Sequence, residues 1–159
     1  MTRASTWTNP DGLVVGFGQA FGERQAAGVD LTDGNIQEYK LQITYQSTFG
    51  STGAKVTVPA GCVVKDVAIK VGTAWVGGTS VAFGDAGNNS GFITAAQGAT
   101  ASLTANTTIV GQGAYVQGNA ATNQGFGKPY AAATDLFVTV VGTYTAGDAT
   151  ITVRVQQNP

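Results

Sequence analysis

Residues 39–46 read Tyr39-Lys40-Leu41-Gln42-Ile43-Thr44-Tyr45-Gln46, so that large apolar side chains alternate with polar ones along the whole stretch. A period of two is typical of a β-strand with one face on a core and the other face in water. We therefore expect a strand here whose core face carries Tyr39, Leu41, Ile43 and Tyr45.

Further strands are expected at intervals of about ten residues after this one. Alternating or apolar runs at 54–58, 62–71 and 79–83 are separated by turn sequences that contain glycine or proline. Such regular spacing favours a β-sandwich or barrel over any fold with helices.

The pattern weakens between residues 84 and 135 and then returns. Short strands are conceivable at 91–94, 107–110 and 114–117, and a helical turn or two at 95–105. Apolar runs at 136–141 and 149–155 flank a glycine-containing connection, which predicts a closing hairpin.

The chain has 159 residues, 23 of them glycine, and no stretch of convincing helical period. We expect an all-β fold of about eight strands, arranged as an antiparallel β-sandwich of the jelly-roll type because the connections in mid-chain are long. Residues 36–159 form this sandwich domain. Residues 1–35, which are rich in glycine, alanine and aspartate, are predicted to form an extended N-terminal arm with one short strand.

Charge and hydropathy exclude some classes of partner. Only 11% of residues are charged, and 8 basic residues against 9 acidic ones leave no excess of positive charge for a phosphate backbone. The sequence also contains no apolar run of about 18 residues and no secretory signal. We expect a protein that is made and used in solution and binds neither nucleic acid nor a membrane.

The residues that most enzymes need are scarce. The chain has no histidine and a single cysteine, which removes the commonest general base and any cysteine cage for zinc. Carboxylates are present, but nothing in their spacing brings two together for glycoside hydrolysis. We therefore expect no enzyme, no cofactor and no metal, and we expect Cys62, in an apolar run, to be a buried structural thiol.

One polar loop has two interpretations. Residues 83–92 place Asp85, Asn88 and Asn89 between aromatic residues. Carboxylate and amide oxygens suit a hard cation such as calcium, but one carboxylate alone usually gives poor affinity. A loop stabilised by its own Asx side chains is the favoured interpretation.

Several separated segments resemble a pattern in structural proteins of tailed phages. They are Val58-Pro59-Ala60-Gly61-Cys62-Val63-Val64-Lys65-Asp66-Val67, then Gly77-Gly78-Thr79-Ser80-Val81-Ala82-Phe83-Gly84-Asp85, and later Tyr130-Ala131-Ala132-Ala133-Thr134. The resemblance covers residues 55 to 155 and is to the family of capsid decoration, or cement, proteins with a jelly-roll-like sandwich. It implies a virion protein on the capsid exterior, made in the host cytoplasm, whose partners are the major capsid protein and itself, as a homotrimer.

The arm is the expected docking element. Trp7, Leu13, Val15, Phe17 and Phe21 make it too apolar for a free tail, and its glycines are too many for a stable helix. We take these five residues and Trp75 as capsid or subunit contacts, with a strand at residues 13–17 adding to an exposed edge of another subunit. The alternative is a head-fibre or tail-associated module for carbohydrate or receptor binding, in which exposed Trp75, Tyr115 or Tyr130 would stack on sugars.

Overall fold

The computed structural model describes residues 6–8, 14–16, 36–117 and 127–157. The chain divides into two compact units, Met1–Ile36 and Gln37–Pro159. In the first unit, β1 (Thr6–Thr8) and β2 (Val14–Gly16) pair in antiparallel fashion, with Trp7 opposite Val15. The arm thus contains two short strands where one was expected.

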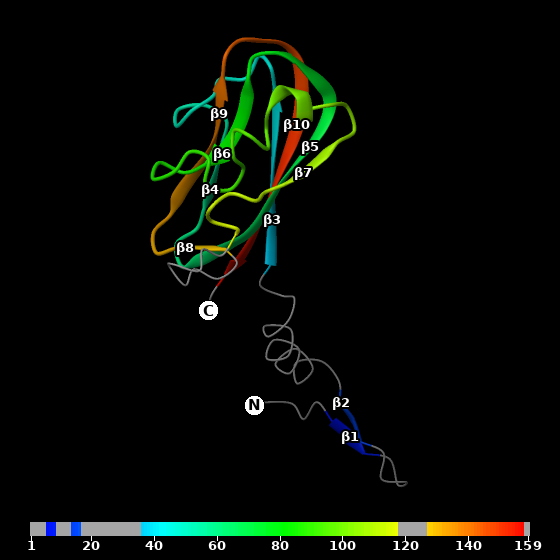
Figure 1. Ribbon diagram of the computed structural model, residues 1–159. Helices are drawn as coiled ribbons and strands as arrows, with labels where there is room; N and C mark the ends of the chain where they lie inside the picture. Colours follow the sequence, from blue (N-terminus) through cyan, green and yellow to red (C-terminus); the bar gives the residue numbers. More distant parts are fainter. Residues whose placement is uncertain (1–5, 9–13, 17–35, 118–126, 158–159) are drawn as a thin grey trace. The chain divides into compact units, whose positions relative to one another are not determined.

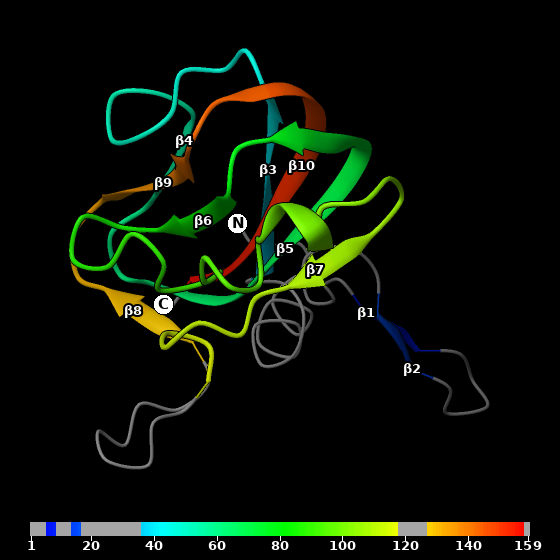
Figure 2. The ribbon, with the colours of Figure 1, turned by 45° about the horizontal axis from the view of Figure 1, so that its top comes forward.

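The second unit is a sandwich of two sheets (Figures 1 and 2). The larger sheet has the order β3 (Ile36–Thr44), β10 (Tyr144–Gln157), β5 (Cys62–Gly77) and β7 (Thr108–Val110), and β8 (Lys128–Tyr130) also pairs with β5. The smaller sheet has the order β4 (Lys55–Val58), β9 (Thr134–Val141) and β6 (Ser80–Gly84). A single 3-10 turn, η1 (Thr100–Ser102), is the helical element that residues 95–105 were expected to hold.

The order of the strands is that of a jelly roll. When a long antiparallel hairpin of eight strands rolls up, strands 1, 8, 3 and 6 form one sheet and strands 2, 7, 4 and 5 form the other. Here β3, β10, β5 and β7 take the first set of positions, and β4, β9 and β6 take positions 2, 7 and 4. Isolated bridges from Phe83 to Ile93 and from Ser80 to Ala99 place the segment after β6 in position 5. The predicted antiparallel, jelly-roll-like sandwich is therefore confirmed.

The core lies between the two sheets and is built from alternate residues of their strands. β5 and β10 supply half of its buried residues, and β4, β6 and β9 face them from the smaller sheet. The fully buried positions include Val64, Val67, Ile69, Val71, Phe83, Leu136, Val138, Ile151 and Val153. Cys62 belongs to the same cluster, and its burial raises the pKa of the thiol, as expected of a structural cysteine.

The prediction that the apolar side chains of residues 39–46 face the core is correct for three of the four. Ile43 is buried, and Tyr39 and Leu41 pack partly buried against the core. Tyr45 is 39% exposed, because β3 ends at Thr44, where Ser47 closes a turn through its hydrogen bonds to the Thr44 backbone.

The predicted closing hairpin is wrong. β9 pairs with β4 and β6 in the smaller sheet, and β10 pairs with β5 in the larger one, so the short connection at Gly142 carries the chain between sheets. Periodicity in the sequence locates strands but does not show which strands pair with each other. Of the three short strands expected in mid-chain, 107–110 is β7, 91–94 makes only a bridge, and 114–117 is a turn.

None of the helical structure described here is long and apolar enough to cross a membrane.

Candidate functional site: a buried carboxylate network

The most elaborate polar cluster among the described residues is centred on Asp85. This residue directly follows β6 and is only 3% exposed. Its Oδ1 accepts hydrogen bonds from the backbone N–H groups of Gly87 and Asn88, both at 2.9 Å. Asn88 Oδ1 in turn accepts bonds from the N–H and hydroxyl of Ser90, both at 3.1 Å. The loop is therefore stabilised by its own Asx side chains, as the favoured interpretation of the sequence held.

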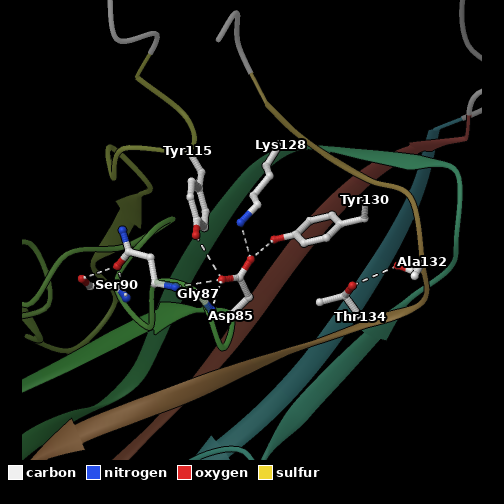
Figure 3. Close-up of polar contacts among 9 residues, drawn as sticks. Asp85, Gly87, Ser90, Tyr115, Lys128, Tyr130, Ala132 and Thr134 are labelled. Carbon is white, nitrogen blue, oxygen red and sulfur yellow. Dashed lines mark hydrogen bonds and ion pairs between the residues drawn. The ribbon is translucent and has the colours of Figure 1, made fainter. Parts of the chain in front are cut away.

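Three side chains from distant parts of the chain complete the network (Figure 3). The Tyr115 hydroxyl donates to Asp85 Oδ1 at 3.0 Å, and the Tyr130 hydroxyl donates to Oδ2 at 2.8 Å. Lys128 Nζ lies 2.6 Å from the same Oδ2 and forms an ion pair with it. Lys128 and Tyr130 are the first and last residues of β8, so alternation along this short strand directs both to one face.

The network joins the two layers of the sandwich. Asp85 lies at the end of β6 in the smaller sheet, whereas β8 pairs with β5 in the larger sheet. Tyr115 belongs to the turn after β7, and its ring packs edge-on against Phe92, with centroids 5.2 Å apart. One carboxylate therefore fixes two long loops and one edge strand that have little regular hydrogen bonding of their own.

The electrostatics of the cluster fix its charges. Burial by itself would raise the pKa of Asp85, but the hydrogen bonds from Lys128 and Tyr130 outweigh it and lower that pKa to about 2. For Lys128, burial acts to lower the pKa, and the bond to Asp85 raises it above its usual value overall. Burial and the neighbouring carboxylate both raise the pKa of Tyr130. At neutral pH Asp85 and Lys128 therefore form an ionised pair, and the Tyr130 phenol is neutral.

The titratable groups of this network are poorly suited to acid–base catalysis at neutral pH. A general acid or base works best with a pKa near the operating pH, and every shift in this cluster moves away from neutrality. The Lys128 ammonium also lies 3.6 Å from the centre of the Tyr115 ring, which adds a cation–π contact to the ion pair. Five donors already occupy the Asp85 carboxylate oxygens that a calcium ion would need. In the described ranges no group of three or more His, Cys, Asp or Glu side chains could hold a metal ion.

The sequence did not reveal this network. It points to Asp85 as part of a polar loop and of the pattern that resembles phage proteins, and it does not single out Lys128. The available signal was the alternation of Lys128 and Tyr130 on one strand face, but nothing in the sequence places that strand beside Asp85.

The structure places the predicted contact residues as follows. Trp75 is 3% exposed, because it is on the inward face of β5, where its ring packs edge-on against Tyr144 at 4.9 Å between centroids. Trp75 is therefore a core residue and not a surface contact. Trp7 and Val15 lie on the paired strands β1 and β2, and Leu13, Phe17 and Phe21 fall outside the described residues.

The aromatic residues proposed for sugar stacking are not displayed on the surface. Trp75 and Tyr130 are buried, and Tyr115 is half-buried with its hydroxyl bonded to Asp85. Burial removes Trp75 and Tyr130 as stacking platforms, and the Tyr115 ring is partly covered.

A second feature is a shallow groove of about 420 Å³ on the outer face of the larger sheet. Its small floor residues, Ala68 and Thr152, lie between charged side chains of both signs. Arg154 contacts Glu38 at 3.3 Å and Asp66 at 3.7 Å across neighbouring strands. The remaining lining residues are Lys40, Lys70, Thr108 and Val110.

Comparison with known proteins gives only weak likeness to solved structures. No family model matches the chain, and no curated protein matches it. A chain of the solved "Cyanophage Pam1 capsid asymmetric unit" aligns with a TM-score of 0.48 and 16% sequence identity, over 78% of this chain and 86% of that chain. A likeness at this level supports no inference about function.

Proposed function

We propose that this protein is a structural component of a phage virion that binds the outside of the capsid and stabilises, or cements, the shell. Its partners in this proposal are the major capsid protein and further copies of itself in a homotrimer. The proposal includes no catalytic activity, no cofactor, and no binding to nucleic acid or membrane.

One observation carries the proposal. Two separated segments of the sequence pattern that resembles phage decoration proteins meet in a single structural network. Gly84-Asp85 ends one segment and Tyr130 begins another, and the Tyr130 hydroxyl bonds to the Asp85 carboxylate at 2.8 Å. The Thr134 hydroxyl, at the end of the later segment, bonds to the carbonyl of Ala132 at 2.9 Å and holds the turn before β9. The pattern therefore describes a way of closing a sandwich, which is what a family of structural proteins would share.

The glycines of the pattern support the same interpretation. Gly61 and Gly77 have φ angles of +74° and +83°, and Gly78 has +56°, in the left-handed region that favours glycine. A Cβ at Gly78 would also meet the ring of Tyr144. These positions serve the turns that begin β5 and connect it to β6.

A cement protein acts through contact area and number of contacts. Burying apolar surface between a bridging subunit and its neighbours contributes roughly 25 cal/mol per Å² before the cost of association. In a trimer each bound copy tethers the other two, so that weak individual contacts combine into firm attachment. This role needs no specialised chemical site, and a network around Asp85 that holds loops in place is consistent with it.

The proposal is tested by adding the purified chain to capsids that lack it, assembled from the major capsid protein of the same phage. Saturable co-sedimentation and a higher temperature of shell disruption are expected. An electron-microscopy map of the decorated particle should show the copies around local threefold axes. A failure to co-sediment at any concentration would contradict the proposal.

The arm has its own test. A chain that begins at Gly34 should keep the β-rich circular dichroism spectrum of the sandwich and lose most of its affinity for the bare capsid. Unchanged binding, or failure to fold, would show that residues 1–35 are not the docking element.

A further inference from the structure

β3 forms one edge of the larger sheet. Its nine residues, Ile36–Thr44, pair with β10 on one side, and within the described part of the chain no strand pairs with its other side. An edge strand of this length presents a row of backbone donors and acceptors to any strand that can approach it. The sequence of β3 indicates which strand could pair with this edge.

The backbone groups that point outward can be identified. Tyr45 N–H donates to the Gly147 carbonyl of β10 at 2.9 Å, so the backbone of Tyr45 faces β10. Because this direction alternates along an antiparallel strand, the odd-numbered residues face β10 and the even-numbered ones face away from it. The backbone of Thr44 agrees, since it points away from β10 and bonds instead to Ser47.

Thr44 is already bonded to Ser47, so the outward-facing residues with backbone groups left to pair are Ile36, Glu38, Lys40 and Gln42. Their side chains share the exposed face of the sheet. Two of them carry opposite charges two positions apart. Lys40 Nζ lies 3.4 Å from Glu38 Oε2 within the strand, and both side chains are largely exposed. When a second copy of β3 runs antiparallel to the first, the Glu38 of each copy can therefore face the Lys40 of the other.

The charges select one register for such a pairing. A two-fold axis at Glu38 places two glutamates opposite each other, and an axis at Lys40 places two lysines opposite each other, which is destabilising. An axis at Tyr39 places Glu38 of each copy opposite Lys40 of the other. The same register pairs Ile36 with Gln42, so that all four outward-facing residues find partners.

We propose that two copies of this protein associate through their β3 edges, antiparallel and around a two-fold axis at Tyr39. The pairing joins the two larger sheets into one continuous sheet with about eight new backbone hydrogen bonds. It goes beyond the proposed function and does not rest on it, because the pairing needs no capsid. In a decorated shell it would link neighbouring trimers.

Sedimentation equilibrium of the full-length chain, from micromolar to millimolar concentration, tests the association. The mean mass should rise with concentration: toward twice the mass of one chain if the protein is monomeric at low concentration, and beyond twice the starting mass if a trimer with three β3 edges is present there. Lys40→Glu, which sets Glu38 against a glutamate of the second copy and leaves the Glu38–Arg154 contact in place, should weaken the association at least tenfold. The double variant Glu38→Lys/Lys40→Glu should restore it, because opposite charges face each other again.

Lys70→Glu is the matched control, since it makes the same change of charge on the same sheet face but on β5, away from the edge. It should associate like the wild type. A mean mass that stays constant up to millimolar concentration would overturn the proposal. So would equal weakening by Lys40→Glu and Lys70→Glu, or a double variant no better than Lys40→Glu.

Cross-linking tests the register directly. Tyr39 would face Tyr39 of the second copy in a pair without mutual hydrogen bonds, where Cα atoms are about 4.5 Å apart, within reach of a disulfide. Tyr39→Cys should therefore give a dimer band on a non-reducing gel after mild oxidation. Leu41→Cys should not, because its counterpart would lie about 14 Å away, four residues along the opposing strand. Linkage at Leu41 and not at Tyr39 would show a different register and overturn the assignment.

Discussion

Replacing Lys128 by methionine tests the central ion pair while keeping a side chain of similar length. The substitution leaves the Asp85 carboxylate buried with four of its five donors. Removing one partner of a buried pair typically costs about 3–5 kcal/mol. The Lys128 side chain is 26% exposed, so solvent partly screens this pair, and we expect a loss of about 2–4 kcal/mol in the free energy of unfolding at pH 7.

The pH dependence gives a second, independent signature. The pKa of Asp85 is lowered from 3.8 to about 2 in the folded protein, a difference worth about 2 kcal/mol at about 1.4 kcal/mol per pH unit. Because the folded value is the lower one, this contribution is fully present above pH 4 and is lost as the pH falls through 2. The methionine variant should lack much of it, so the gap between the two proteins should narrow between pH 4 and pH 2.

The assay is urea unfolding of both proteins at several pH values, followed by circular dichroism. Lys55→Met is the control, since Lys55 forms an ion pair of similar length with Asp135, at 2.7 Å, on the surface of the smaller sheet. Surface pairs contribute about 0–1 kcal/mol, so this variant should be nearly as stable as the wild type. One contrary result is that the two variants lose equal amounts of unfolding free energy, and another is that the difference between Lys128→Met and the wild type stays constant with pH. Either result would refute a stabilising role for the buried pair.

Three further predictions concern other parts of the fold. Tyr130→Phe should lower the free energy of unfolding by about 1.5–3 kcal/mol, measured by urea titration, because it removes a donor from the network's buried carboxylate. Gly147→Ala should lower the melting temperature more than Gly50→Ala does: both have positive φ angles, but only at Gly147 would the new Cβ meet a core side chain, the Trp75 ring at 2.6 Å. Cys62 should react with a thiol reagent only after unfolding, because burial raises its pKa and hides the sulfur; fast labelling of the native protein would contradict this.

The sequence predicted those features that depend on local pattern. Alternation located β3, β5 and β10, and glycine in turns located the connections between them, because a strand half in water repeats every two residues. Pairing depends on contacts between segments far apart in sequence, and here prediction failed. The runs at 136–141 and 149–155 read as a hairpin, yet the jelly roll places them in opposite sheets. Trp75 shows a related limit: the strand expected at 62–71 stops short of it, whereas β5 continues to Gly77 and places Trp75 on its inward face.

The same reasoning explains why the candidate site was found only in part. Asp85 was noticed for its local Asx chemistry, which the structure confirms through the bonds to Gly87 and Asn88. Its ion pair with Lys128 spans 43 positions, and no local rule connects the two residues. Yet Gly84-Asp85 and Tyr130 both belong to segments that resemble phage decoration proteins, and the structure shows that they touch. A shared pattern with widely separated parts can therefore indicate a contact that neither part reveals alone. The contact found here closes the sandwich, and every pKa shift resolved in it is directed away from neutrality.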